Sequence, residues 1–334
     1  MPDIYRRKQR LHVWGLLVLL LTCNSTERSN GSGVTDLHIA ENSFLKADTE
    51  GQFSAISYNI AGLPAIICSA KTPRAASIAA IGKKLRQFDI VHVQEDFNYH
   101  ADLYDNDDVH NYRTETKGPV PFGDGLNTLS KFPLSNVVRV KWNNCTGADC
   151  MTPKGFTYSK IQVASNVFID FYNVHSNAYN TLHAASARRE NIKQLSAYIR
   201  DHSSGNAVIL MGDLNGRYGF FYDNIQILTA ENQLQDAWVM HKKKGKRPDP
   251  LKIIPAANIL NLTDSCETID KIFYRSSETI ELKTISYSFL NQIFNTKEGL
   301  PLSDHHPVSA EFSWRIKPER EYLSETRLPV KKDH

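Results

Sequence analysis

One short strand that ends in polar side chains constrains the fold of this chain more than any other feature. Residues 207–211 are all apolar, and Gly212-Asp213-Leu214-Asn215 follows them directly. Such a short run predicts a fully buried strand rather than an independent helix. The strand would deliver Asp213 and Asn215 to a sheet edge, where loops on a rigid scaffold commonly carry function. A lone Gly-Asp-x-Asn is also typical of an ordinary Asx turn. The ends of the other predicted strands therefore determine whether these residues are part of a functional site.

The same pattern recurs along the chain. Helical periodicity over 73–88 and 184–200 alternates with strand-like segments, which indicates an α/β fold. Turn chemistry alone does not account for polar groups at the end of so many apolar strands. The polar side chains at or just beyond predicted strands are Asn59, Glu95, His175, Asp213, Asn215, Asp270, Asp304 and His305.

Length and composition allow a large core, because the chain has 334 residues of which 41% are hydrophobic. Four basic residues precede the apolar run 11–21, which predicts a signal peptide over 1–23, with a signal anchor as the alternative. We expect a flexible leader over 24–50, a folded domain over 51–316 and a charged tail over 317–334. Without residues 1–23, basic and acidic residues balance, so net charge gives no argument for nucleic-acid binding.

Cysteine usage fits an exported protein. Four cysteines remain after residue 23, and an even number predicts two disulfides with three possible connectivities. Cys145–Cys150 would close a small loop between two strands, and Cys68–Cys266 would follow. Four Asn-x-Ser/Thr sequons also suit a secreted glycoprotein.

The strand-end residues form a coherent chemical set. Oxygen ligands from Asn59, Glu95 and Asp304 suit Mg²⁺, with Mn²⁺ or Ca²⁺ as further candidates. Two histidines and a separate aspartate suit proton transfer around a phosphodiester. The sequence has no Gly-rich P-loop and no Gly-x-Ser-x-Gly elbow, which argues against nucleoside-triphosphate and serine-hydrolase chemistry.

In these motifs the chain resembles the endonuclease/exonuclease/phosphatase superfamily. The resemblance covers about residues 53–314 and implies an α/β fold of the α+β type. This is a four-layer α/β/β/α sandwich in which two mostly antiparallel sheets pack face to face. The motifs that carry it are Ser57-Tyr58-Asn59, Val93-Gln94-Glu95, His175, Gly212-Asp213-Leu214-Asn215, Ile269-Asp270-Lys271-Ile272-Phe273-Tyr274 and Ser303-Asp304-His305-His306-Pro307.

The resemblance also implies roles for the site residues. Glu95 would be the main Mg²⁺ ligand, assisted by Asn59 and Asp304. Asp213 would orient or deprotonate the attacking water, and Asn215 would hold the phosphate or Asp213. His175 would donate to the phosphoryl oxygens. His305 would be the second catalytic histidine, and Asp270 would orient it.

The segments 124–133 and 154–161 resemble secreted sphingomyelinases. The apolar segment 287–294 predicts either a loop that contacts a membrane or an edge strand in the core. The basic run 241–248 predicts a solvated loop, with contact to DNA phosphates as the alternative. The sequence thus favours a secreted, monomeric, Mg²⁺-dependent phosphodiester hydrolase that prefers a membrane lipid headgroup to nucleic acid. A secreted DNase I-like nuclease and a surface-binding pseudoenzyme are the alternatives.

Overall fold

The computed structural model describes residues 48–255 and 259–318, and their strands form two six-stranded sheets. The first sheet contains, in spatial order, β11 (Ile280–Phe289), β12 (Val308–Ile316), β1 (Glu50–Asn59), β2 (Ile90–Gln94), β4 (Asn127–Ser130) and β3 (Tyr112–Arg113). The second contains β5 (Leu134–Lys141), β6 (Gly155–Ala164), β7 (Val167–His175), β8 (Val208–Asp213), β10 (Asp270–Arg275) and β9 (Gln235–Asp236).

Each sheet is antiparallel except for one parallel pair, and these pairs decide where polar side chains meet. β1 runs parallel to β2 with Asn59 opposite Gln94, and β7 runs parallel to β8 with His175 opposite Asp213. The carboxyl ends of parallel neighbours lie at the same edge of a sheet. Residues that end or follow β1, β2, β7 and β8 therefore lie at one end of the sheets, which we call the site end.

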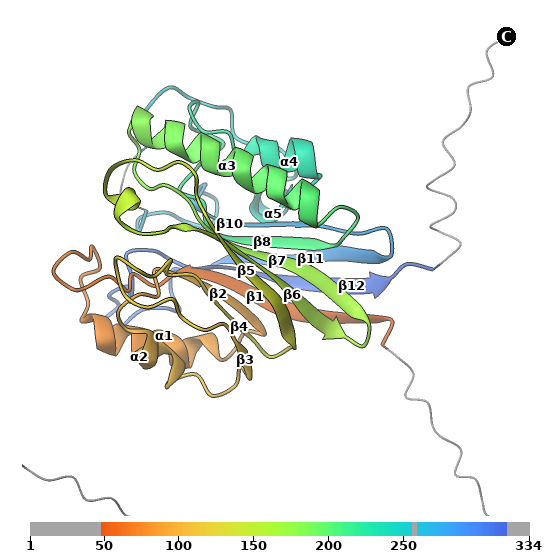
Figure 1. Cartoon of the computed structure of the whole chain (residues 1–334), viewed down its shortest axis with the longest axis horizontal. Coiled ribbons are helices and arrows are strands. Elements are labelled where there is room, and N and C mark those ends of the chain that lie inside the picture. Colours follow the sequence, from red (N-terminus) through yellow and green to blue (C-terminus); the bar gives the residue numbers. More distant parts are fainter. Residues whose placement is uncertain (1–47, 256–258, 319–334) are drawn as a thin grey trace, which may run out of the picture. The chain divides into compact units, whose positions relative to one another are not determined.

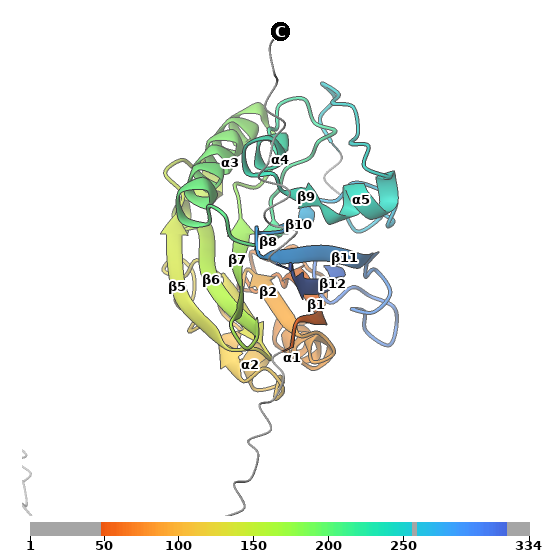
Figure 2. The ribbon, with the colours of Figure 1, turned by 90° about the vertical axis from the view of Figure 1, so that its right-hand side faces the viewer.

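Helices cover the outer face of each sheet, so the chain has the four layers expected from its sequence (Figures 1 and 2). α1 begins after Pro73, and its apolar residues Ile78, Ile81 and Leu85 are buried at helical spacing. The helices are α1 (Arg74–Leu85) and α2 (His100–Tyr104) on the first sheet, and α3 (Leu182–His202), α4 (Gln226–Asn232) and α5 (Ala237–Lys243) on the second.

The main hydrophobic core lies between the sheets. Phe53 of β1 stacks on Phe312 of β12 at 5.4 Å between ring centroids, and it also approaches Phe171 of β7 at 6.4 Å. A second core fills the space between the first sheet and α1, where Tyr58 meets Phe294 edge-on at 4.9 Å. The two cores lie on opposite faces of the first sheet, because Phe53 and Ala55 of β1 belong to the core between the sheets and Ile56 and Tyr58 to the core against α1. Close packing on both faces holds the strand ends at the site end in fixed positions.

The segment 287–294 belongs to these cores. Tyr287 and Phe289 point inward from β11, and Phe294 is fully buried against Tyr58. The membrane contact predicted for these aromatic side chains is therefore wrong. The physical reason is strand alternation, which places residues 287 and 289 on the same face of the sheet.

The basic run also differs from its prediction as a loop. Residues 241–243 form the last turn of α5, where positive charges interact favourably with the helix dipole. The helix ends at Lys243. The next residue, Lys244, has a left-handed backbone conformation, and the remaining basic residues lie in the loop beyond it.

No helix among the described residues has the length and apolar character needed to cross a bilayer. The predicted signal peptide over 1–23, most of the predicted leader and residues 319–334 of the predicted tail lie outside the described residues.

Candidate active site

The structure brings the predicted strand-end residues of both sheets together at the site end. The amide of Asn59, which ends β1, donates a hydrogen bond of 3.1 Å to Asp213 Oδ2, which ends β8. This bond joins the first sheet to the second. Asp213 also lies opposite Asp270, the first residue of β10. Polar side chains that are far apart in sequence therefore converge because the two parallel pairs finish at the same place.

Asp213 is an almost fully buried carboxylate at the centre of the cluster. Its Oδ1 accepts the backbone N–H of Asn215 at 2.9 Å, so the Asx turn considered from sequence does form here. The Asn215 amide donates to the carbonyl of Ser176 at 3.2 Å, which holds Asn215 against Asp213. Burial raises the pKa of Asp213 to about 6, and the negative charge of Asp270 adds to the rise while the positive charge of His305 opposes it.

His305 and Asp270 form a hydrogen-bonded pair. The distance between His305 Nδ1 and Asp270 Oδ2 is 2.9 Å, and His305 Nε2 lies 3.7 Å from Asp213 Oδ2. Burial alone would lower the pKa of His305, but the charges of Asp270 and Asp213 outweigh it and raise that pKa well above its ordinary value. His305 is thus held as an imidazolium whose Nε2 faces the reactive groups.

His175 is fully enclosed and lies between two carboxylates. Its Nε2 is 3.6 Å from Asp213 Oδ2 and 3.9 Å from Glu95 Oε1. Trp142 Nε1 donates to the backbone carbonyl of His175 at 2.7 Å and fixes the end of β7. Burial lowers the pKa of His175 well below its ordinary value, with the positive charges of Lys154 and His305 contributing. The two histidines therefore differ in charge at neutral pH.

Glu95 follows β2 with a left-handed backbone, φ 59°, which is uncommon for a residue other than glycine. The N–H of Gly62 donates to the Glu95 carbonyl at 2.9 Å, which supports this conformation from the loop after β1. Burial raises the pKa of Glu95, Lys154 lowers it, and the negative charge of Asp304 raises it further. Glu95 and Asp304 therefore repel each other electrostatically.

The loop before β12 is fastened to the end of β1. The Ser303 hydroxyl donates to the Asn59 carbonyl at 2.7 Å, and the His305 N–H donates to the Ser303 hydroxyl at 3.3 Å. Asn59 Oδ1 accepts the N–H of Ala61 at 3.1 Å, which leaves the oxygen one further lone pair. These bonds place Asp304 and His305 beside the first sheet's polar strand ends.

Two sets of residues have the chemistry of a divalent-cation site. The ligand atoms of Asp213, Asp270 and His305 lie within 4.8 Å of one another. However, His305 already bonds Asp270 and is held protonated, which suits proton transfer better than coordination. The oxygen donors of Glu95, Asp304 and Asn59 fit a hard cation better, because a cation would remove the repulsion between the two carboxylates.

Lys154 is a site residue that the sequence-based assignment of roles missed. It precedes β6, is buried, and forms a 2.7 Å ion pair with Asp149 of η1 (Gly147–Met151). Its charge lowers the pKa of both Glu95 and Asp213, against the larger effect of burial. The available signal was the lysine in the sphingomyelinase-like segment 154–161.

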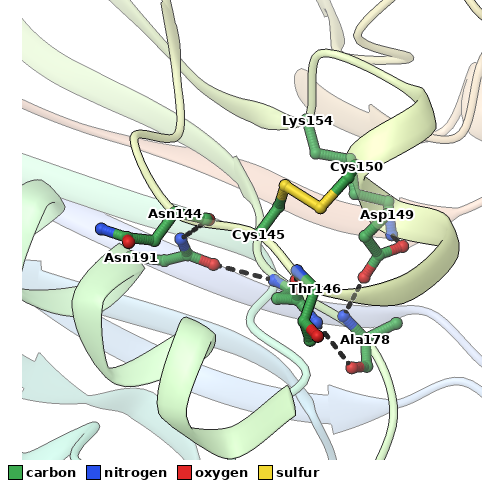
Figure 3. Close-up of a disulfide and its surroundings, with 9 residues drawn as sticks. Asn144, Cys145, Thr146, Asp149, Cys150, Lys154, Ala178 and Asn191 are labelled. Atoms are coloured by element: carbon green, nitrogen blue, oxygen red, sulfur yellow. Dashed lines mark hydrogen bonds and ion pairs between the residues drawn. A yellow bond between two sulfur atoms is a disulfide. The ribbon is translucent and has the colours of Figure 1, made fainter. Parts of the chain in front are cut away.

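The disulfide Cys145–Cys150 closes the loop that carries Asp149, as predicted (Figure 3). The Asp149 carboxylate accepts the N–H of Ala178, beyond the end of β7, and the Asn191 amide donates to the Asn144 carbonyl at 2.8 Å. The loop is thus fixed to α3 just before Cys145, and to the segment after β7 by Asp149, which lies between the two cysteines. Its ion pair then fixes Lys154.

The second predicted disulfide is absent, because Cys68 and Cys266 are both free thiols. Cys68 donates to the carbonyl of Ala61 in the loop after β1, and Cys266 contacts Thr263 in the loop before β10. The chain thus holds these two sulfurs in separate loops with separate partners. Burial raises the pKa of the Cys68 thiol.

Two buried arginines hold the site loops from the flanking helices. Arg74, at the start of α1, donates to the carbonyls of Ala61 at 2.9 Å and Leu302 at 2.8 Å. Arg188 of α3 donates to the carbonyl of Asn177 at 2.9 Å and to Asp223 at 2.9 Å. The sequence signal for Arg74 was its place in a first helical turn, where the dipole disfavours a cation.

Residues 83–244 match the model of the endonuclease/exonuclease/phosphatase family 2. This match, the two-sheet sandwich and the strand-end cluster agree with the resemblance to the endonuclease/exonuclease/phosphatase superfamily that the sequence motifs carry. Sphingomyelinases of Mycobacterium tuberculosis and Mycobacterium bovis are 37% identical to it over 271 residues. That alignment covers 79% of this chain and 53% of each relative, so the chain spans about half the length of these relatives.

Solved structures share the fold at lower identity. Sphingomyelinase C from Streptomyces griseocarneus is 20% identical, with a TM-score of 0.54 over 78% of this chain and 99% of its own. A Staphylococcus aureus beta toxin with bound magnesium ions is 16% identical, with a TM-score of 0.53 over 78% and 99%. D. rerio TDP2, complexed with a single-strand DNA product, is 14% identical, with a TM-score of 0.56 over 78% and 98%. These likenesses establish the fold and leave the substrate open.

Proposed function

We propose that this chain is a metal-dependent phosphodiesterase that cleaves sphingomyelin into ceramide and phosphocholine. The observation that carries the proposal is the convergence of Asp213, the His305–Asp270 pair, His175 and Glu95 at one end of the sheets. The 37% identity to mycobacterial sphingomyelinases supports this substrate over a nucleic acid.

Asp213 is the proposed general base. A carboxylate with a pKa of about 6 is ionised at neutral pH and still basic enough to take a proton from water. Water oxygen then bonds to phosphorus, and the bond from phosphorus to the ceramide oxygen breaks. Asn215 keeps Asp213 in place through the backbone hydrogen bond, so of its two proposed roles we favour holding the aspartate.

The His305 imidazolium is the proposed acid for the leaving oxygen. Asp270 fixes its Nδ1 and keeps the ring charged, so Nε2 is available to give a proton to the ceramide alkoxide. His175, whose Nε2 faces the same carboxylates, is placed to donate a hydrogen bond to a phosphoryl oxygen. Preorganised donors of this kind usually supply the largest catalytic contribution.

Glu95, Asp304 and Asn59 are the proposed ligands of a divalent cation, with Mg²⁺ the first candidate. A bound cation would place positive charge beside the phosphoryl oxygens and so stabilise the growing negative charge. Lys154 adds a fixed positive charge close to Glu95.

The test is hydrolysis by the purified chain with Mg²⁺ present. Sphingomyelin liposomes and supercoiled plasmid DNA are supplied in parallel, and we expect phosphocholine release without nicking. Glu95→Gln and His305→Ala should each lower the rate by roughly 100-fold or more. Exposed Glu278 and His183 give matched controls, Glu278→Gln and His183→Ala, which should retain activity.

The alternative functions predict other results in the same assay. Nicked plasmid without phosphocholine would identify a nuclease. D. rerio TDP2, which was solved with a single-strand DNA product, shares the fold of this chain. No hydrolysis of either substrate with any of Mg²⁺, Mn²⁺ and Ca²⁺ would favour the surface-binding pseudoenzyme. Wild-type rates in both site variants would refute the assigned mechanism.

We further propose that the protein is secreted as a monomeric glycoprotein. The disulfide suits an oxidising compartment, and the sequon residues Asn144 and Asn261 are both exposed. Expression in a eukaryotic secretory line should yield the chain in the medium, with a mass that falls after glycosidase treatment. Retention inside the cell without glycans would contradict the proposal, and light scattering measures the oligomeric state.

A further inference from the structure

We propose that the site end docks on a lipid bilayer through exposed apolar side chains on the loops around the candidate active site. This inference rests on the proposed function, because a lipid phosphodiester lies at a membrane surface. It replaces the membrane contact predicted for 287–294, whose aromatic side chains are buried. We call the docking surface the apolar rim and define it as Ile66, Ile67, Phe122, Met151, Ile253 and Ile254.

The exposure of large hydrophobic side chains is strongly uneven along the molecule. Ile66 is 93% exposed, Phe122 77%, Ile253 73% and Met151 72%. Among the described residues, every large hydrophobic side chain that is more than half exposed lies at the site end, in a loop or at a helix start. Scattered exposed apolar residues are normal, but a concentration at one end marks an interaction surface.

Two loops of the rim are fixed to Glu95 and the residue that follows it. The loop with Ile66 and Ile67 follows β1, and its Gly62 N–H donates to the Glu95 carbonyl at 2.9 Å. The loop with Phe122 precedes β4, and its Gly125 carbonyl accepts the N–H of Asp96 at 3.0 Å. Figure 1 shows the loops after β1 and before β6 at the same end of the sheets. Ile66, Ile67 and Phe122 therefore lie on loops that are anchored at the candidate metal ligand.

The loop before β6 adds Met151, which lies just before the buried Lys154. The disulfide closes the segment immediately before Met151, and Asp149 ties that segment to Ala178, beyond the end of β7. Met151 is thus presented on a fixed turn rather than on a free end. Because the backbone that carries Met151 is already ordered, burial of this side chain against a partner costs no loop ordering.

The remaining loop of the rim belongs to the second sheet. Leu251 pairs through its backbone with Gly219 and Phe221, each at 2.9 Å, in the loop that follows Asn215. Asn180, in the loop after His175, donates to the carbonyl of Pro255 at 3.0 Å. Ile253 and Ile254 are therefore held beside the loops that leave β7 and β8.

Charge around these isoleucines favours a bilayer as the occupant. The exposed segment 244–255 contains the basic residues Lys244, Lys246, Arg247 and Lys252 and one acidic residue, Asp249. Lys252 Nζ also lies 5.0 Å from the centre of the exposed Phe221 ring. Apolar tips flanked by lysine and arginine are typical of interfacial segments, in which the cations remain at the level of lipid phosphates.

The experiment measures binding separately from catalysis. Co-sedimentation with phosphatidylcholine vesicles, with and without phosphatidylserine, reports docking on a bilayer that contains no sphingomyelin. We expect the double variants Ile66→Ser/Ile67→Ser and Ile253→Ser/Ile254→Ser each to lower the partition coefficient about tenfold or more. Val137→Ser/Val138→Ser, which alters two exposed valines on edge strand β5, is the matched control and should bind like the wild type.

A second measurement uses a water-soluble phosphodiester, bis(4-nitrophenyl) phosphate. If the rim serves docking, its variants keep the wild-type rate on this substrate and lose rate on sphingomyelin liposomes. Wild-type vesicle binding by both rim variants overturns the inference, even when phosphocholine is released. Rim-dependent vesicle binding without any phosphodiester hydrolysis removes the proposed function and leaves the docking surface standing.

A second copy of the chain as the occupant would give another pattern. Light scattering would then show a concentration-dependent dimer that the rim variants abolish, and vesicles would not sediment the wild type. That result would also overturn the bilayer as occupant. Because all the altered side chains are exposed, unchanged thermal unfolding is expected and checks that each variant is folded.

Discussion

At the scale of single residues, the site combines charges that the fold would not keep for stability alone. Glu95 and Asn215 both have left-handed backbones, and Asp213 is buried next to Asp270. Strained or desolvated groups of this kind persist where surrounding contacts hold them, and they gather at functional sites. The hydrogen bonds from Asn59, Gly62 and Asn215 supply those contacts.

Asp213→Asn should exchange activity for stability. The folded-state pKa of Asp213 is raised to about 6, so the folded protein binds the extra proton below that pH and loses stability as pH rises through about 6. Asparagine does not titrate. The free energy of unfolding of the variant, relative to that of the wild type, should therefore be about 2–3 kcal/mol higher at pH 8 than at pH 4, with EDTA present. Urea unfolding at both pH values measures this difference.

The exposed Asp105→Asn change is the control for this pH dependence and should give no such gain. If the free energy of unfolding changes with pH equally in Asp213→Asn and in the wild type, the buried carboxylate does not titrate as described. The activity of Asp213→Asn should fall by roughly 100-fold or more with Mg²⁺ present.

His92 offers an independent pH test outside the site. It is buried in β2 with its ring edge-on to Phe171 at 5.9 Å, and burial lowers its pKa to about 3. A lowered histidine pKa means that stability present above the unfolded-state value is lost as pH falls toward the folded-state value. From pH 7 to pH 5, the free energy of unfolding of the wild type should therefore fall by about 2 kcal/mol more than that of His92→Leu.

Urea unfolding at pH 7 and pH 5 measures the effect of His92. The exposed His183→Leu change is the control, and it should lose stability with pH as the wild type does. A His92→Leu slope equal to the wild-type slope would argue against a buried neutral imidazole between the sheets.

At the scale of elements, the disulfide loop controls Lys154. Reduction should free η1, weaken the Asp149–Lys154 ion pair and lower kcat several-fold. Loss of a loop closure this short costs about 2 kcal/mol of unfolding free energy in the chain-entropy view. Phosphocholine release and urea unfolding, with and without reductant, measure the two effects.

Lys154→Ala tests whether the loop acts through this lysine. The variant should be slower than the wild type, and reduction should slow it no further, because the ion pair is already gone. If reduction lowers the activity several-fold in both the wild type and Lys154→Ala, the loop affects activity by another route.

The elements that sequence predicts well are those whose local pattern agrees with their tertiary surroundings. The apolar run before Asp213 becomes β8, Pro73 starts α1, and the motif order gives the fold and the cluster of strand-end residues. The Cys68–Cys266 pairing failed because counting cysteines says nothing about which loops meet. The membrane contact predicted for Phe289 and Phe294 was wrong, because an apolar segment beside a site has the same sequence pattern whether it is buried or exposed.

Residues that act through charge or loop support were the hardest to predict. Lys154, Arg74 and Arg188 make their contacts with segments far away in sequence, so no local spacing reveals them. The apolar rim was equally hidden, because its residues lie singly on loops and form no periodic pattern. Only the meeting of the two sheets shows which loops share an end.

At the scale of the whole molecule, metal binding should stabilise the fold. A cation that binds the folded chain and not the unfolded one adds about 2–3 kcal/mol of unfolding free energy at roughly 100 times its dissociation constant. Thermal unfolding with saturating Mg²⁺ and with EDTA measures this. We expect a higher midpoint with Mg²⁺ in the wild type and in the control Glu278→Gln.

Glu95→Gln should lose the response to Mg²⁺, because it removes the proposed main ligand. An undiminished response in Glu95→Gln, together with loss of the response in Asp270→Asn, would place the cation at Asp213, Asp270 and His305 instead.

The outer strands of the domain have a consequence for how the chain can be rearranged. Glu50 pairs with Arg315, and the N–H of Ile316 donates to the carbonyl of Thr49 at 2.7 Å, so both ends of the described domain leave together. They do so at the end of the sheets opposite the apolar rim, where the turn between β6 and β7 also lies. A circular permutant that joins the domain ends and opens at this turn would therefore keep every loop of the site intact. The same geometry keeps a fluorescent protein fused at Asp48 or Pro318 away from a docked bilayer.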